Sequence, residues 1–193
     1  MVMLIVGILL FLGIHSVRMV APAWREQFMK DRGESAWKGL YSVVSLVGLV
    51  LMVVGFGQAR LSPVVIWVPP VALRHVALLL MALSWVLLVS AYVPKNHFKA
   101  RMGHPMVVGV KTWALAHLLA NGNLHSMLLF ASFLVWSIVI FVALRRRDRA
   151  AGAVPVTAAW GPTVLALVVG LLMYGLFVSV LHQWIIGRPV LGG

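Results

Sequence analysis

The stretch from Leu124 to Leu144, LHSMLLFASFLVWSIVIFVAL, decides the class of this protein. It contains no Asp, Glu, Lys or Arg, and the basic run RRRDR at 145–149 follows it directly. A helix of about 20 mainly apolar residues is long enough to cross the hydrocarbon core of a bilayer. The stretch therefore predicts a transmembrane helix with a basic boundary at its C-terminal end.

Five more apolar runs of this kind occur along the chain, at approximately 2–20, 37–57, 70–92, 105–120 and 163–186. The run 105–120 is short, but a tight turn at 121–123 can join it to the next run as a helical hairpin. Hydrophobic residues make up 62% of the chain, against about 45–50% in ordinary globular domains. The sequence predicts an all-α bundle of about six transmembrane helices, forming one domain over 1–193, with no GxxxG pair for tight helix packing.

The basic residues are distributed unevenly between the loops, and short cytoplasmic loops are the ones that retain Lys and Arg. The first, third and fifth loops hold most of them: Arg18, Arg25, Lys30, Arg32, Lys38, Lys95, Lys99, Arg101, Arg145, Arg146, Arg147 and Arg149. The opposite side holds little beyond Arg60, Arg74 and Arg188. This asymmetry predicts cytoplasmic odd-numbered loops and both termini on the periplasmic or external side.

The composition also excludes several classes of function. The chain has no cysteine, which rules out disulfides, thiolate metal sites and cysteine nucleophiles. Its net charge is +12, but the positive residues flank apolar runs, which points to topology and anionic lipid rather than to nucleic acid. The lipid bilayer is therefore the predicted partner, and nucleic acid is not expected.

Histidines and cations at membrane depth are the candidate functional residues, because such side chains need a partner or a role there. His15 and Arg18 share one side of the first span, where Arg18 can also simply reach the lipid headgroups. His104 precedes Pro105 at the entrance of the fourth span, and Lys111 returns to nearly the same face. We expect Lys111 to face the bundle and to meet an anionic group from the chain, a lipid or a ligand.

Neutral imidazole is a good ligand for iron, copper and zinc, and two histidines on different helices suit bis-axial ligation of haem b. The pair His15 and His104 is the first candidate, with His75, His117 and His182 as a second cluster near the opposite face. Covalent haem attachment is excluded because there is no CxxCH motif. A mononuclear zinc site stays open, although no carboxylate lies within a span to complete it.

Several short motifs together resemble the NnrU family of bacterial membrane proteins. The resemblance covers nearly the whole chain and rests on Gly13-Ile14-His15-Ser16 with Arg18, Trp37-Lys38-Gly39-Leu40-Tyr41-Ser42, Trp67 with Pro69-Pro70, Arg74-His75, His104-Pro105-Met106 with Gly109, Lys111, Trp113 and His117, Asn121-Gly122, and Leu181-His182-Gln183-Trp184. It implies a bacterial inner-membrane protein associated with denitrification, in the production or regulation of nitrite and nitric oxide reductases.

The NnrU family is in turn similar to the 15-cis-ζ-carotene isomerases, which are membrane enzymes that contain haem b. This likeness implies that His15 and His104 are the axial ligands and that the substrate is a lipophilic polyene. Two roles follow as expectations: a haem-dependent cis–trans isomerase, or a non-enzymatic membrane factor that assists, senses for or exchanges electrons with nitrogen-oxide reductases.

One part of the family pattern differs here. The family usually reads Arg-His-Pro, whereas this chain has Arg101-Met102-Gly103-His104-Pro105. Arg-His-Pro also marks membrane methyltransferases of the isoprenylcysteine type, which need acidic residues in their C-terminal region. No Asp or Glu follows Arg149, so the methyltransferase is the less favoured alternative.

Overall fold

The computed structural model describes residues 1–153, 157–187 and 189–190, and their regular structure is helical. Its elements are α1 (Val2–Val20), α2 (Pro22–Arg32), α3 (Glu34–Ala59), α4 (Val71–Ser90), α5 (His97–Met102), α6 (Pro105–Ala120), α7 (Leu124–Ala150), α8 (Trp160–Leu176), the π-helix η1 (Phe177–Leu181) and α9 (His182–Ile186). The prediction of an all-α protein is confirmed.

Among the described residues, five helical segments are long and apolar enough to cross a membrane: α1, α3, α4, α7 and the continuous run from α8 to α9. The chain is therefore a multi-pass membrane protein. The sixth predicted span, α6, is apolar but has only 16 residues, fewer than the roughly 20 that a span requires. The sixth crossing and the side of the two termini stay predictions, and Arg188, one of the residues counted for orientation, lies outside the described residues.

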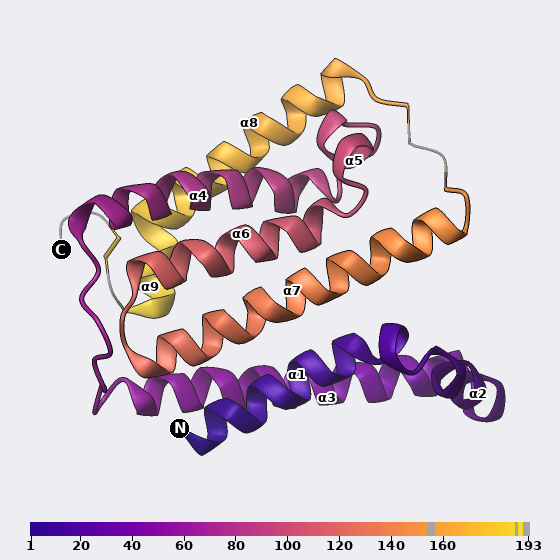
Figure 1. Ribbon diagram of the computed structural model, residues 1–193, viewed down its shortest axis with the longest axis horizontal. Helices are drawn as coiled ribbons and strands as arrows, with labels where there is room; N and C mark the ends of the chain where they lie inside the picture. Colours follow the sequence, from indigo (N-terminus) through magenta and orange to yellow (C-terminus); the bar gives the residue numbers. More distant parts are fainter. Residues whose placement is uncertain (154–156, 188, 191–193) are drawn as a thin grey trace.

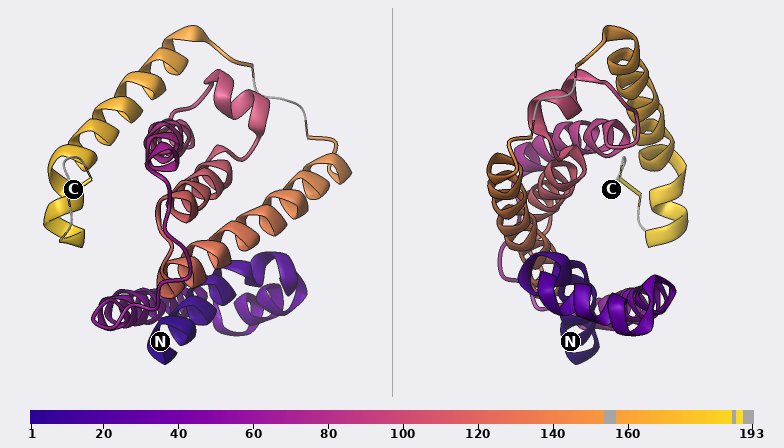
Figure 2. Two further views of the ribbon diagram at one scale, coloured as in Figure 1. Left: turned by 60° about the vertical axis from the view of Figure 1, so that its left-hand side comes forward. Right: turned by 90° about the vertical axis from the view of Figure 1, so that its right-hand side faces the viewer.

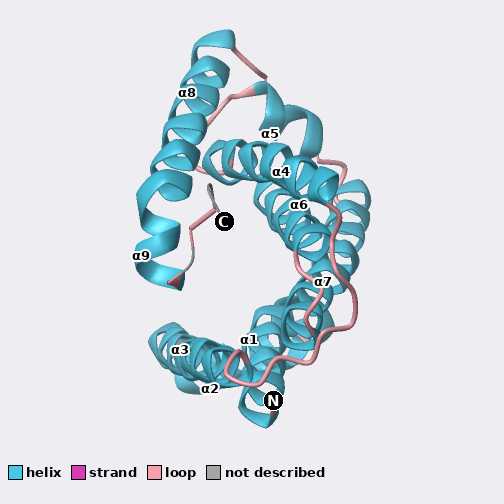
Figure 3. Cartoon of the chain, turned by 90° about the vertical axis from the view of Figure 1, so that its left-hand side faces the viewer, coloured by secondary structure: helices cyan, strands magenta, loops and turns pink. Residues whose placement is uncertain are grey.

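The helices form a curved layer in the order α3, α1, α7, α6, α4, α8 (Figure 1). Seen end on, this layer bends into an open C, with α3 and α8 at its two ends (Figure 3). The two side views agree that α8 runs obliquely past α4 before it continues into η1 and α9 (Figure 2). The helices α2 and α5, which sequence reasoning did not predict, lie in the first and third loops.

Glycines bring α1 and α3 into backbone contact. A Cβ at Gly7 would lie 2.5 Å from the backbone nitrogen of Met52, and one at Gly48 would lie 2.8 Å from that of Phe11. A Cβ at Gly55 would likewise collide with the backbone of Leu4. The sequence has no GxxxG pair, and this close packing is made instead by glycines of two different helices, with Gly48 and Gly55 seven positions apart on α3.

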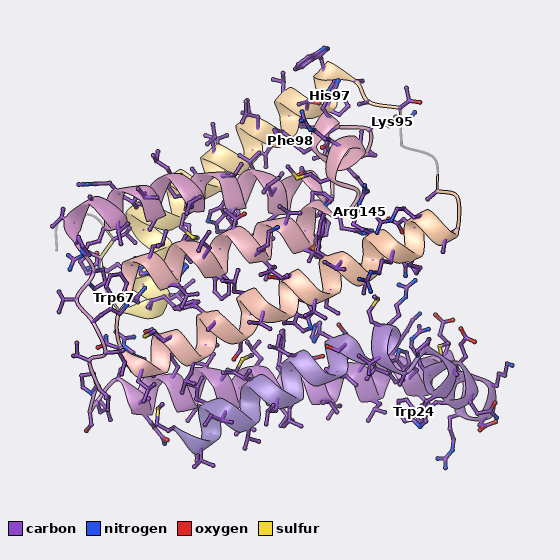
Figure 4. All side chains as sticks on the ribbon, in the orientation of Figure 1. Trp24, Trp67, Lys95, His97, Phe98 and Arg145 are labelled. Atoms are coloured by element: carbon purple, nitrogen blue, oxygen red, sulfur yellow. The ribbon has the colours of Figure 1, made fainter. Side chains whose placement is uncertain are left out.

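A loop also fixes the α6–α7 hairpin. The backbone N–H groups of Ile66 and Trp67 both donate to the carbonyl oxygen of Gly122, at 2.8 and 3.2 Å. Leu124 N–H donates to the carbonyl oxygen of Val64 at 2.8 Å. Figure 4 shows Trp67 at this end of the bundle, in the segment between α3 and α4. The predicted turn at 121–123 is thus confirmed, and the loop before α4 holds it in place.

Candidate functional site

His15 lies on α1 among aromatic rings from three helices. Its ring stacks on Phe11 at 4.2 Å, with Tyr41 of α3 at 5.1 Å and Trp136 of α7 at 6.5 Å. The Nδ1 atom is 2.7 Å from the carbonyl oxygen of Phe11. A carbonyl only accepts hydrogen bonds, so Nδ1 carries a proton, and in the neutral ring Nε2 then presents a lone pair. Metal-binding histidines are commonly oriented in this way.

A hydrogen bond joins the residue after His15 to α7. The indole Nε1–H of Trp136 donates to the hydroxyl oxygen of Ser16 at 2.9 Å, and that hydroxyl donates to the carbonyl oxygen of Leu12 at 2.7 Å. These bonds fix the rotation of α1 against α7 and hence the direction of the His15 ring. Arg18, one turn further along α1, is exposed at the end of the helix.

His104 is the N-cap residue of α6, immediately before Pro105. Its Nε2 lies 2.7 Å from the Oδ2 atom of Asp148 on α7. Arg145 lies about one turn earlier on α7 and is labelled in Figure 4. Its side chain lies close to Gly103, the residue before His104. Sequence reasoning missed the partnership with Asp148; the available signal was a single acidic residue inside the basic run 145–149.

Lys111 occupies the middle of α6 and is half-buried. Its Nζ lies 5.2 Å from the ring centroid of Phe141 on α7, in a cation–π arrangement. Lys111 thus faces a neighbouring helix, as expected, but the group it meets there is an aromatic ring and not a carboxylate. A lipid or ligand anion as a further partner stays a prediction.

The two first-choice ligands contact different parts of α7. His15 lies beside Trp136, and His104 bonds to Asp148. These two positions on α7 are about 18 Å apart along the helix axis, whereas an imidazole nitrogen lies about 2 Å from a metal that it ligates. In this conformation the structure does not bring the two rings together around one metal.

The second histidine cluster is partly assembled. The ring of His117 stacks on Phe130 at 4.4 Å, and its Nδ1 lies 2.9 Å from the carbonyl oxygen of Trp113. His182, at the start of α9, lies 5.8 Å from the ring of Phe177 and close enough to His117 for the two rings to interact electrostatically. The third member, His75, is exposed near the start of α4.

One local arrangement therefore occurs twice. His15 and His117 each follow an aromatic residue by four positions, and each donates Nδ1–H to the carbonyl oxygen of that residue. Among the described residues, no group of three or more His, Asp or Glu side chains could hold a metal. Mononuclear zinc takes three or four protein ligands, but haem iron needs only one or two.

A family model described as NnrU protein matches residues 3–190, nearly the whole chain. No curated protein matches the chain. No solved structure matches it either.

Proposed function

The chain belongs to the NnrU family, and from this premise we propose that it is a haem b protein of the bacterial inner membrane that takes part in denitrification. The observation that carries the proposal is the way in which the His15 ring is held. Its ring is held among three aromatic side chains, its Nδ1–H is bonded to Phe11, and its Nε2 presents a lone pair. In its neutral form such a ring is a nitrogen ligand fixed in direction.

Each of the two first-choice histidines is a candidate ligand by itself, but the two contact positions on α7 that lie about 18 Å apart along the helix axis. His15 offers Nε2, and His104 is oriented by the carboxylate of Asp148. Arg18 at the end of α1 is a candidate for pairing with a propionate, and Lys111 lies deeper, on α6. A single haem held by both His15 and His104 does not fit this conformation, so we derive no reaction step through that pair.

Bound haem would supply an iron centre that can change oxidation state. The chain's own contribution is to fix the imidazole tautomer through the Phe11 carbonyl and to surround the ring with apolar groups. Two roles for the haem protein are open: cis–trans isomerisation of a lipophilic polyene, and a non-enzymatic role beside nitrogen-oxide reductases. An isomerase assay in cells distinguishes them. Cells that are supplied with a poly-cis carotenoid and express the protein should accumulate its trans isomer under the first role only.

We expect purified protein to show a Soret band, with sharp α and β bands after reduction by dithionite. Replacement of both His15 and His104 by alanine should remove these bands, because the double change removes both first-choice ligands, whichever of them holds the iron. The matched control is His97→Ala, since His97 bonds to Thr163 and belongs to neither candidate cluster. Absorbance spectra of the three proteins, purified in detergent, make the measurement.

Two other results would change the proposal. A featureless spectrum despite ample haem supply would contradict haem binding and leave the non-enzymatic membrane factor. Bands that survive the double replacement would move the ligands to the cluster of His117, His182 and His75.

A further inference from the structure

The last helical segment of the described chain lies across the opening of the curved layer. We call residues 177–186, which comprise η1 and α9, the terminal arm. Figure 3 shows α9 facing α3 across this opening, and the two views of Figure 2 show the same approach. Within the described residues, no backbone packing joins α3 to α8, η1 or α9. The connection between the two ends of the layer is therefore made by side chains.

A hydrogen bond from an arginine side chain makes this connection at the end of α9. The Nη1 group of Arg60, the C-cap residue of α3, donates to the carbonyl oxygen of Ile186 at 2.9 Å. Ile186 is the last residue of α9, which ends at Gly187 with a φ of +74°. The last carbonyl groups of a helix lack partners within it and carry partial negative charge, so a guanidinium is favourable there. Arg60 thus holds the end of the terminal arm to the end of α3.

The other end of the terminal arm carries three features that weaken a helix. Phe177–Leu181 is a π-helix, a form that is rare and frequent at functional sites. The hydroxyl of Ser179 donates to the carbonyl oxygen of Gly175 at 2.7 Å, and such bonds to the preceding turn often bend helices. Gly175 has no packed neighbour within 4 Å of the position that its Cβ would take, so no close helix contact offsets the flexibility of glycine. The chain is therefore able to bend at this point.

The terminal arm forms one wall of a groove that lies between it and α4, α6 and α7. The groove has a volume of about 280 Å³, and Phe177 lines it together with Trp85 and Trp113. The rings of Phe177 and Trp85 are 5.3 Å apart. The arm also carries His182, which lies close to His117 on α6. Movement of the arm would open the groove to the lipid and separate these two histidines.

We propose that the terminal arm is a lateral gate of the bundle, with η1 as its hinge and the hydrogen bond from Arg60 to Ile186 as its latch. The structure shows the gate in its closed state. When the bond breaks, bending at η1 carries α9 away from α3 and widens the opening of the curved layer. A molecule dissolved in the bilayer reaches the groove by this route. The gate does not depend on haem binding, because neither Arg60 nor any residue of η1 is a candidate haem ligand.

The test measures the distance between α3 and α9 in the full-length protein in lipid nanodiscs. The chain has no cysteine, so Leu46→Cys and Ile185→Cys, both at exposed positions, provide the two sites for nitroxide labels. Double electron–electron resonance should show one main distance when Arg60 is present. Arg60→Ala should raise the share of longer distances about 3–10-fold, because it removes one hydrogen bond. Arg60→Lys keeps a donor and should restore most of the main distance.

Two controls distinguish opening of the gate from loosening of the whole bundle. Arg74→Ala removes an exposed guanidinium from α4 and should leave the distances unchanged. Labels at Leu46 and at the exposed Leu79 of α4 should report the same distance with and without Arg60→Ala, because neither helix belongs to the gate.

Three results would overturn the proposal. The first is an identical distance distribution between positions 46 and 185 in the wild-type and Arg60→Ala proteins. The second is an equal increase of longer distances in the Arg74→Ala protein. The third is a matching change between positions 46 and 79, which would show that Arg60 stabilises the bundle as a whole and not the terminal arm.

Discussion

Leucine in place of Gly55 is expected to lower the free energy of unfolding by about 3 kcal/mol or more, because a side chain there would have to occupy the space of the α1 backbone. Gly55 faces Leu4, which is fully buried in a cluster with Ile8, Leu12 and Met52. The change makes the α3 span more apolar, so membrane insertion should be unaffected. The loss is therefore one of helix packing, and it should lower the melting temperature in detergent by roughly 6–12 °C.

The matched control is Gly57→Leu, in the same helix and two residues away. Nothing lies within 4 Å of the position that a Cβ at Gly57 would occupy, so the same increase in side-chain size meets no backbone. Equal melting temperatures for the two variants would contradict the close approach of α1 and α3. Circular dichroism and size-exclusion chromatography of both proteins provide the comparison.

Alanine in place of Gly122 is expected to release the loop before α4 from the α6–α7 hairpin. Its Cβ would collide with the carbonyl oxygen of Trp67, and Gly122 itself accepts hydrogen bonds from Ile66 and Trp67. Separating these two backbone segments breaks two hydrogen bonds, at a net cost of about 1–3 kcal/mol in total. Amide hydrogen exchange of residues 64–67 should accelerate, and the melting temperature should fall by roughly 2–12 °C.

Gly161→Ala serves as the control for this change, because nothing lies within 4 Å of the position its Cβ would take. Slow exchange at residues 64–67 in the Gly122→Ala protein would show that the loop stays attached. That result would contradict the contact between Gly122 and Trp67.

Much of the fold could be predicted from the sequence. The run 124–144 and its apolar counterparts mark the helices, because a backbone in hydrocarbon must satisfy its hydrogen bonds internally and helices do so within one segment. The structure extends α7 from Leu124 through the basic run to Ala150, since Arg residues favour helix as well as the interface. The π-helix at Phe177–Leu181 was not predicted, because nothing in its local sequence distinguishes it from α-helix.

The candidate site was predictable residue by residue but not as an arrangement. His15, His104 and His117 stand out because polar groups in apolar runs are rare, and their backbone partners at i−4 follow from helix geometry. Their partners on other helices do not follow from spacing. The bond from His104 to Asp148 joins positions 44 residues apart, and no local signal pairs them.

The sequence by itself determined that this protein is helical, lies in a membrane and belongs to the NnrU family, because these properties depend on composition and on the order of short motifs. The tertiary structure decided which polar groups meet: it separated His15 from His104 along α7 and brought His117 near His182. The physical reason is that helix packing depends on shape at points of contact, such as Gly7 and Gly55 against the opposing backbone. Such contacts arise only when two distant segments fold against each other.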